Sequence, residues 1–327
     1  MAGRGGRPAA GSAVAGGLVG GWVADRVLGD PQRGHPVAGL GAVAATLERR
    51  LHRDHPAAGA LHWLVVVAPP VASTWWLQRR LAAHPLGVAA LTAATGWAAT
   101  GGHQLTEVAA AIAAAVESGD LAAARERLPW LVGRDPASLD GDGIVRAVVE
   151  SVAENTADAV VGPLWWGAVA GPAGIVAHRA VKTLDAMVGH RSPRYARFGV
   201  VAARADDLAN LVPARLTAAL VCVLAPLVDG SPRRAWRTWR RDAPRHPSPN
   251  AGPVEAATAG ALGVQLGGPL DYGHGVERRG PFGDGPTPAA GDIRRAVRLT
   301  TAVGAAAVGL AAALALVRSP VGRVRRG

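Results

Sequence analysis

The sequence predicts an all-α, polytopic membrane protein with about four to seven membrane helices, some kinked or re-entrant, plus amphipathic helices. The first observation is the length of segments without Asp, Glu, Lys or Arg, because a bilayer-spanning helix needs about 20 mainly apolar residues. The second is that 61–77 (LHWLVVVAPPVASTWWL) lacks the polar stripe that a helix on the surface of a soluble, Ala-rich bundle would need. Five long uncharged segments occur, at 8–24, 55–78, 81–106, 159–178 and 299–317.

The first of these segments, 8–24, predicts a membrane helix that is stopped by the Gly-Asp-Pro sequence at 29–31. Arg4 and Arg7 precede the apolar run, as in a secretory signal peptide. The run is rich in glycine and a second polar motif follows at once. A retained first membrane helix is therefore the preferred interpretation.

The next two segments predict helices of different kinds. Residues 40–53 have the alternating polar and apolar faces of a short amphipathic helix. Residues 55–78 are apolar and carry a double proline at 69–70, which should kink the helix. Neighbouring helices can satisfy the backbone groups that such a kink releases.

The segment 107–132 is rich in alanine, carries charges at helical spacing and predicts two helices broken at 118–120. A turn then leads into a strongly helical segment, for which Asp140 or Asp142 is the expected N-cap. No β-alternation of useful length occurs along the chain. The predicted protein is therefore helical throughout.

The uncharged segment 159–178 contains Gly-Pro at 162–163 and Gly-Pro-Ala-Gly at 171–174, which do not suit one straight helix. We expect it to be broken or re-entrant, since such backbone is tolerated where protein or water covers it. A broken or re-entrant segment would return the polar clusters before and after it to the same side of the membrane.

The C-terminal third contains shorter apolar runs separated by a basic linker. The runs 216–228 and 256–270 predict marginal spans or helices buried against the others. The linker 229–253 is rich in Arg and Pro and carries two tryptophans, so it is either an interfacial helix touching anionic lipid or a solvated basic loop. The run 299–317 predicts a C-terminal membrane helix.

The charge pattern favours membrane anchoring over nucleic-acid binding. The formal net charge is +11 and the sequence pI is about 11.3, yet only Lys182 among 35 basic residues is lysine. Arginines flank the apolar segments, at Arg79, Arg80 and Arg318 for example, and no nucleic-acid-binding module is recognisable. The single cysteine, Cys222, lies in an apolar stretch and predicts a buried, inert thiol.

The densest group of polar residues begins with Arg146, Glu150, Glu154 and Asp158, which recur every four residues and share one helix face. Arg146 and Glu150 could form an ordinary ion pair. Three stacked carboxylates repel one another unless a metal, a metal–nucleotide complex or basic groups compensate. The alternative is a solvated acidic face, which the neighbouring 159–178 segment makes less favourable.

A second group follows the uncharged segment. His178, Lys182 and Asp185 share a helix face, and a donor-rich turn at 189–195 comes next. The further polar candidates are Asp30, His35, Asn155, Arg179, Arg191, Arg194, Arg204, Asp206, Asp207, Asn210 and Asn250. No Walker A phosphate loop, H-E-x-x-H zinc pattern, nucleophile elbow or dinucleotide fingerprint is present, so any nucleotide site is of a non-standard kind.

The segments VVESVAENTADAVVGPL and AHRAVKTLDAMVGHRSPRYARFGVVAARADDLANLVPARLTA resemble the signature region of the CobD/CbiB family of adenosylcobinamide-phosphate synthases. Gly-Asp-Pro at 29–31, His-Pro-Val at 35–37 and SPNAG at 248–252 resemble further family motifs and occur in the family's order. The resemblance implies one integral membrane domain over 1–327, with a motif-bearing core at about 25–265.

The resemblance also implies a reaction, which is the ATP-dependent joining of adenosylcobyric acid to (R)-1-amino-2-propanol or its O-phosphate through an amide bond. Mg²⁺ would accompany ATP, the corrinoid would be a substrate, and no tightly bound prosthetic group is expected. The protein would lie in the cell membrane with a cytoplasm-facing site. Other enzymes of the cobalamin pathway are possible partners, and nucleic acid is not an expected one.

The candidate residues can be assigned to the steps of that reaction. The catalytic candidates are Glu150, Glu154, Asp158, Lys182, Asp185, Asp206 and Asp207. Among them Glu150, Glu154 and Asp207 are the expected Mg²⁺ ligands. Lys182, Arg191 and Arg194 would bind phosphate or the corrinoid carboxylate, and Asp206 or Asp207 would be a general base. The substrate-binding candidates are Asp30, His35, Asn155, His178, Arg179, Arg191, Arg194, Arg204, Asn210 and Asn250.

Two other classes of function compete with this interpretation. A membrane transporter or a scaffold for corrinoid-handling enzymes would also suit broken helices with polar groups, although no inverted repeat is visible. A pyridoxal-phosphate decarboxylase needs a Schiff-base lysine in a soluble α/β fold. Lys182 lies among predicted membrane helices, so that class is rejected.

Overall fold

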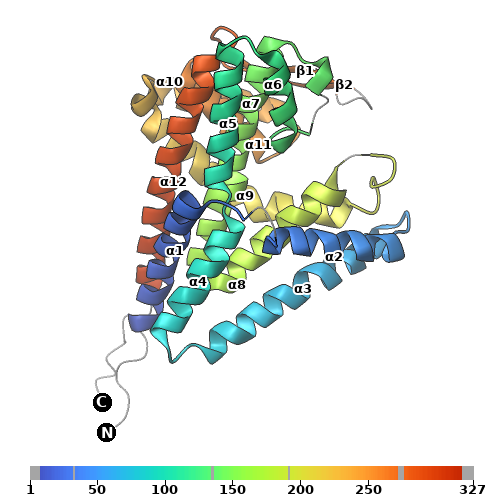
Figure 1. Cartoon of the computed structure of the whole chain (residues 1–327), viewed down its shortest axis with the longest axis vertical. Helices are drawn as coiled ribbons and strands as arrows, with labels where there is room; N and C mark the ends of the chain where they lie inside the picture. Colours follow the sequence, from blue (N-terminus) through green and yellow to red (C-terminus); the bar gives the residue numbers. More distant parts are fainter. Residues whose placement is uncertain (1–7, 32–33, 134–135, 191, 272–275, 319–327) are drawn as a thin grey trace. The chain divides into compact units, whose positions relative to one another are not determined.

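The computed structural model of the protein describes residues 8–31, 34–133, 136–190, 192–271 and 276–318. These residues are almost entirely helical, which confirms the predicted all-α class (Figure 1). Contacts between residues divide the chain into two compact units. The first comprises 1–101, 162–209 and 307–327, and the second comprises 102–161 and 210–306.

Four helical stretches of the described residues are long and apolar enough to cross a membrane. They are Pro56–Arg80, Gly141–Gly189, Val200–Val228 and Ala290–Arg318. Three of them contain apolar segments that the sequence analysis identified as long uncharged runs, and Val200–Val228 contains the run 216–228. The polytopic prediction is thereby confirmed by length and composition.

The first unit is built from α1 (Pro8–Leu28), α2 (Pro36–Leu51), α3 (Pro56–Arg80), α4 (Pro85–Ala99), α8 (Gly162–Leu184) and the beginning of α9 (Val200–Leu224). Helices α1 and α4 approach closely because small residues face each other. A Cβ built on Gly21 would lie 2.8 Å from the carbonyl oxygen of Ala93 and 3.1 Å from the Cα of Gly96. Such small-residue contacts let helix backbones pack tightly where lipid provides no hydrophobic driving force.

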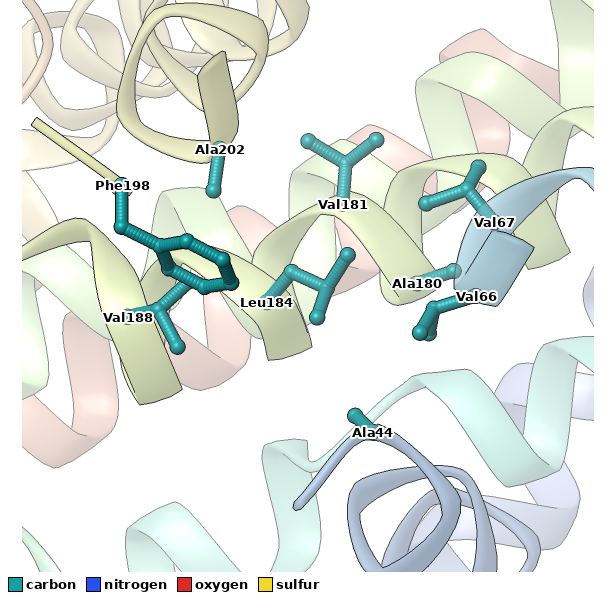
Figure 2. Packing of buried hydrophobic residues seen from close by; sticks show 9 residues of the cluster. All are labelled: Ala44, Val66, Val67, Ala180, Val181, Leu184, Val188, Phe198 and Ala202. Carbon is teal, nitrogen blue, oxygen red and sulfur yellow. The ribbon is translucent and has the colours of Figure 1, made fainter. Parts of the chain in front are cut away.

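An apolar core joins α2, α3, α8 and the start of α9 in this unit. Leu184 and Val188 pack around the ring of Phe198, as Figure 2 shows. The same cluster includes Ala44, Val66, Val67, Ala180, Val181 and Ala202. Gly59 of α3 lies against the carbonyl of Phe198 so closely that a Cβ would overlap the oxygen at 1.8 Å. This core fixes the end of α8, where the predicted lysine site lies.

Helix α8 is broken at Gly171, whose φ of 68° and ψ of −159° lie outside the helical region. Pro172 follows, and a Cβ on Gly171 would meet the side chain of Gln78 at 2.8 Å. The prediction of a broken segment within 159–178 is therefore confirmed. A π-helical turn, Asp185–Gly189, follows α8 directly. That the polar clusters before and after this segment return to one side of the membrane stays a prediction.

The apolar run 81–106 does not form one long helix but is divided between two helices. Helix α4 ends at Ala99, Thr100 is extended, and α5 (Gly102–Glu117) begins a new helix. Helix α5 ends as expected at 118–120, where Gly119 has a φ of 78°. Asp120 then caps α6 (Leu121–Arg127) by accepting a hydrogen bond from the Ala123 N–H at 2.9 Å.

The second unit further contains α7 (Gly141–Asn155), the π-helical turn Thr156–Val161, α10 (Pro232–Asp242) and α11 (Ala251–Leu262). Asp140 is the N-cap of α7, since its Oδ1 accepts from the Gly143 N–H at 2.8 Å. Every residue of α11 is buried. A helix of 12 residues is about 18 Å long, too short to span a bilayer, so the run 256–270 begins as a buried helix.

Two features of this unit depart from the sequence pattern. Strands β1 (Leu266–Asp271) and β2 (Val276–Phe282) pair antiparallel, although no β-alternation predicts them. The basic linker 229–253 is mostly the helix α10 and a 3₁₀ turn, Ala243–Arg245, so its interpretation as a solvated loop is wrong. The long helix α12 (Ala290–Arg318) begins in this unit.

Candidate functional site

The only lysine of the chain lies between two carboxylates in the first unit. The Nζ of Lys182, in the last turn of α8, lies 3.0 Å from Oδ2 of Asp206 and 3.3 Å from Oδ2 of Asp185. The side chains of Lys182 and Asp185 are 21% and 24% exposed, and that of Asp206 is 10% exposed. We call these three residues the Lys182 cluster. The sequence placed Lys182 and Asp185 on one face, and α9 brings Asp206 to it.

The surroundings of the Lys182 cluster contain several other predicted residues. His178 lies one turn earlier on α8 and is 2% exposed. Asp207 follows Asp206 on α9, and its Oδ2 lies 3.9 Å from Nη1 of Arg204, whose side chain is 79% exposed. A Cβ on Gly189 would lie 2.0 Å from Oδ1 of Asp185, so a larger residue here would require this carboxylate to move. The cluster thus sits at the end of a helix, near the surface and partly open to solvent.

Arg194, predicted to bind phosphate, has a carboxylate partner that the sequence analysis did not identify. Its Nη2 lies 2.9 Å from Oε1 of Glu48, which also accepts from the Tyr195 hydroxyl at 2.8 Å. Burial raises the pKa of Glu48, but these two hydrogen bonds and the Arg194 charge outweigh it and hold that pKa below its usual value. Arg194 therefore fastens the 189–195 turn to α2 in this structure.

The two predicted residues of the N-terminal motif, Asp30 and His35, lie near each other. Nε2 of His35 lies 3.7 Å from Oδ1 of Asp30, and Nδ1 of His35 accepts from the Val37 N–H at 3.2 Å. His35 is thereby the N-cap of α2. Of the two predicted residues, His35 therefore caps the helix and Asp30 lies beside its ring.

In the second unit, Arg146 and Glu150 of α7 both bind strand β1. The Oε1 of Glu150 accepts from the Gly267 N–H at 2.8 Å, and Nη1 of Arg146 donates to the Gly267 carbonyl at 3.3 Å. Glu150 is 2% exposed and Asp158, on the π-helical turn, is 8% exposed. A solvated acidic face is therefore excluded for these two carboxylates. Arg146 and Glu150, whose i,i+4 spacing suggested an ion pair, instead both bind the backbone of Gly267, one at its carbonyl and the other at its N–H.

This contact leads to a test of Glu150 by isosteric substitution. Glu150→Gln keeps an acceptor for the Gly267 N–H but replaces a charged hydrogen bond by a neutral one, so we expect a loss of about 1 kcal/mol in stability. We expect product formation to fall less than in Glu154→Gln, because Glu154 is only partly buried and lies nearer solvent. Thermal unfolding and product yield measure the two effects. A larger loss of yield in Glu150→Gln than in Glu154→Gln would instead assign Glu150 to the chemistry.

Asn155 and Asn210, two amides predicted to bind corrin side chains, lie inside the second unit. Asn155 Nδ2 donates to the Ser151 carbonyl at 2.9 Å and to its hydroxyl at 3.1 Å. Asn210 is fully buried. These positions favour structural contacts over direct ligand binding in this conformation.

The SPNAG motif at 248–252 forms the start of α11. Ser248 Oγ accepts from the N–H groups of Asn250 and Ala251 at 3.3 and 3.2 Å. Oδ1 of Asn250 accepts from Nη1 of Arg215 at 3.0 Å. These contacts tie the motif to α9 and satisfy the first N–H groups of the buried helix.

A buried His–Glu pair accompanies this motif, and the sequence analysis did not identify it. Nε2 of His246 lies 3.6 Å from Oε1 of Glu255, and the two side chains are 2% and 0% exposed. Nδ1 of His246 accepts from the Ser248 N–H at 2.9 Å. The signal that was available is one acidic residue within an otherwise apolar run of small side chains, since burying a lone carboxylate is costly without a partner.

The expected Mg²⁺ ligands were tested against the geometry. The part of the chain that the structure describes has no group of three or more His, Cys, Asp or Glu side chains arranged to hold a metal ion. Mg²⁺ that arrives with a nucleotide needs only one or two protein carboxylates, because phosphate and water supply the rest. Asp207 and Glu154 fit that requirement because both are partly exposed, and Glu150 fits less well because it is buried and holds Gly267.

A surface groove in the second unit was also missed. It has a volume of about 690 Å³ and runs along the first turns of α12, beside Ala110 of α5. Its charged lining consists of Asp292, Arg294, Arg295 and Arg298. Arg294 is paired with Glu117, and Arg295 with Asp292, whereas Arg298 is exposed. Arginine side chains of this kind suit phosphate and carboxylate ligands.

The predicted site residues are divided between the two units. Those in the first unit are Asp30, His35, His178, Arg179, Lys182, Asp185, Arg194, Arg204, Asp206 and Asp207. Those in the second unit are Glu150, Glu154, Asn155, Asp158, Asn210 and Asn250. Arg191 lies outside the described residues. The structure brings Lys182, Asp185 and Asp206 into direct contact.

Comparison with known proteins adds a family relationship. The family model described as CobD/Cbib protein matches residues 18–300. The chain is 52% identical over 304 residues to the cobalamin biosynthesis protein CobD of Mycobacterium tuberculosis (strain ATCC 25618 / H37Rv), covering 93% of this chain and 96% of that protein. The proteins of the same name from Chromobacterium violaceum and Stutzerimonas stutzeri are 44% and 40% identical, over 84% and 87% of this chain and 88% and 92% of theirs. No solved structure matches the chain.

Proposed function

Because this chain belongs to the CobD/CbiB family of cobalamin biosynthesis proteins, we propose that it catalyses ATP-dependent amide formation between adenosylcobyric acid and (R)-1-amino-2-propanol or its O-phosphate. The corrinoid carboxylate is activated as an acyl phosphate with release of ADP. The amine then attacks the acyl carbon and displaces phosphate. The observation that supports this proposal most is the Lys182 cluster, which lies within the segment that resembles the family signature.

The Lys182 cluster can meet two demands of this chemistry. A compact ammonium group binds phosphate as a point charge, and two carboxylates hold Lys182 in place for that task. The contact to Asp206, at 3.0 Å, is shorter than the contact to Asp185, at 3.3 Å. When an anionic phosphate approaches Nζ, Lys182 can keep its ion pair with Asp206 and give up its longer ion pair with Asp185.

The released carboxylate of Asp185 is then in position to act on the amine. An ammonium substrate must lose a proton before its nitrogen lone pair can attack, and a positioned carboxylate can accept that proton. Lys182 remains beside the oxygen on which negative charge develops and stabilises it electrostatically. In this proposal Asp206 is a positioning residue that keeps the lysine in reach after the exchange.

Mg²⁺ would be held by Asp207 together with the nucleotide phosphates, and its role would be to neutralise phosphate charge. The protein would work in the cell membrane, with its site facing the cytoplasm.

The experiment that tests the proposed function uses full-length protein purified in detergent. It is mixed with adenosylcobyric acid, aminopropanol or aminopropanol phosphate, ATP and Mg²⁺, and the corrinoid is analysed by mass spectrometry. We expect a mass increase that corresponds to amide formation and requires ATP. A folded preparation that gives no product, even after a cell extract is added to supply a missing partner protein, would favour a transporter or a scaffold instead.

A further inference from the structure

Helix α10 packs on the second unit through one narrow side. Ala235, Thr238 and Asp242 lie at i, i+3 and i+7 and are all buried. The opposing surface is α11, whose Gly260 lies so close that a Cβ would approach Cα of Ala235 at 2.7 Å. Since each residue turns a helix by about 100°, these three residues point in nearly one direction. The orientation of α10 on its unit is therefore fixed by close packing.

The opposite side of α10 is exposed and basic. Arg233, Trp236, Arg237 and Arg240 lie at i, i+3, i+4 and i+7, and all four are exposed. We call these four residues the basic face of α10. Trp236 is 50% exposed, and the guanidinium of Arg240 lies 5.9 Å from its ring centre.

Two carboxylates near this helix pair with other arginines. Asp242 and Asp284 pair with Arg241 at 2.8 and 2.7 Å, and Asp242 also pairs with Arg245 at 3.1 Å. Among the described residues, no carboxylate lies within ion-pair distance of the three arginines of the basic face. Three positive charges therefore point outward without an ion-pair partner among the residues that the structure describes.

The position of α10 along the chain places it at a membrane surface. It begins at Pro232, directly after the candidate span Val200–Val228. Arg295, near the start of the candidate span Ala290–Arg318, donates to the Val228 carbonyl from Nε at 3.1 Å and from Nη2 at 2.7 Å. Residues 216–228 of this span are uncharged and are followed directly by Asp229, so we expect the chain to leave the hydrocarbon at the Val228 end.

We propose that the basic face of α10 binds anionic phospholipid headgroups at the membrane surface. Guanidinium groups form paired hydrogen bonds with phosphate oxygens, and arginines close to an anionic leaflet are attracted to it. Trp236 adds the amphipathic ring that is enriched at membrane–water interfaces. A nucleic acid would be attracted by the same charges, but it would not explain why the face lies where two spans end.

The test uses the full-length protein in detergent, mixed with equal amounts of phosphatidylglycerol and phosphatidylcholine and examined by native mass spectrometry. We expect the wild-type chain to retain phosphatidylglycerol preferentially. The variant R233Q/R237Q/R240Q should lose at least about tenfold of this preference, because each arginine near an anionic surface contributes roughly fivefold. The matched control R49Q/R50Q/R53Q removes three exposed arginines near the end of α2 and should keep the preference.

A second measurement reports where the helix lies. A nitroxide on Trp236→Cys, in a Cys222→Ala background, is compared in nanodiscs with and without phosphatidylglycerol. Collisions with a water-soluble nickel complex should fall several-fold in the anionic discs. Equal collision rates in both discs, or a lipid preference unchanged by R233Q/R237Q/R240Q, would overturn the proposal. RNA binding that this variant abolishes while lipid preference persists would identify a nucleic-acid surface instead.

Discussion

Replacing Lys182 by methionine is expected to lower the rate of corrinoid amide formation by about 10²–10³-fold, the loss typical of removing one group that stabilises developing charge. Most of this loss should appear in kcat, because the lysine acts on the activated intermediate in our proposal. Asp206→Asn should cost less than Lys182→Met, since it only loosens the lysine. Product formation at saturating substrate, followed by mass spectrometry, measures both effects.

Methionine at this position leaves Asp185 and Asp206 without the cation between them, so the variant must be shown to fold. Lys182→Arg provides the second measurement, because it keeps the charge but changes its shape and position. We expect it to fold normally and to retain only a small part of the activity. The exposed Glu126→Gln is the matched control and should behave as wild type. Full activity in a folded Lys182→Met variant would remove the cluster from the mechanism.

The chain offers an independent reporter of this lysine. Lys182 is the only lysine in the sequence, so reductive ¹³C-methylation labels one side chain besides the N-terminal amine. A change in its resonance on addition of ATP or aminopropanol phosphate would place the ligand near Nζ. This signal requires no turnover and separates loss of binding from loss of chemistry.

Replacing Asp242 by alanine is expected to destabilise the second unit by about 1–3 kcal/mol, because it leaves the buried Gly283 N–H without its acceptor and two half-exposed arginines without their carboxylate. The side chain of Asp242 is fully buried and is held by Arg241 at 2.8 Å, by Arg245 at 3.1 Å and by the Gly283 N–H at 3.0 Å. These contacts join α10, the 3₁₀ turn after it and the end of β2. Thermal unfolding and hydrogen exchange around Gly283 measure the loss.

Asp284→Ala is the matched control for this variant. Asp284 binds the same Arg241, but its side chain is 77% exposed, and exposed pairs contribute only about 0–1 kcal/mol. A comparable loss of stability in both variants would mean that burial does not decide the effect, which would contradict the prediction.

Asp242 also makes the free energy of unfolding depend on pH, and the direction of this dependence can be predicted. Burial raises the pKa of Asp242, but the hydrogen bonds from Arg241 and from the Gly283 N–H outweigh it and hold that pKa below its ordinary value. Because the folded pKa is the lower one, the stabilisation is complete above the unfolded pKa of about 3.9 and is lost as pH falls through the folded value. Asp242→Asn should therefore weaken the dependence of unfolding on pH below about 4.

Helix boundaries were the best-predicted part of this molecule, and the reason is local chemistry. Asp120 and Asp140 cap helices because their side chains reach N–H groups three residues ahead, an interaction within one turn of chain. The break in α8 follows from Gly171 and Pro172, which act on their own backbone. Such features need no knowledge of the rest of the fold.

Contacts between distant segments could not be predicted in the same way. Glu150 and Arg146 have the spacing of an ion pair, but both bind the backbone of Gly267, which is more than a hundred residues away. Glu48 similarly finds Arg194 across 146 positions. The hairpin β1–β2 was missed because its strands contain glycine and proline and no alternation, so its order depends on partners elsewhere in the unit.

The buried α11 bears on how the topology of this protein is counted. Every segment that is counted as a crossing reverses the side assigned to everything after it. Since α11 is too short to cross a bilayer, we expect α10 and the start of α12 to lie on the same side of the membrane, and the contact of Arg295 to Val228 supports this expectation. A hydropathy count that includes 256–270 as a crossing would reverse the side that is expected for the start of α12.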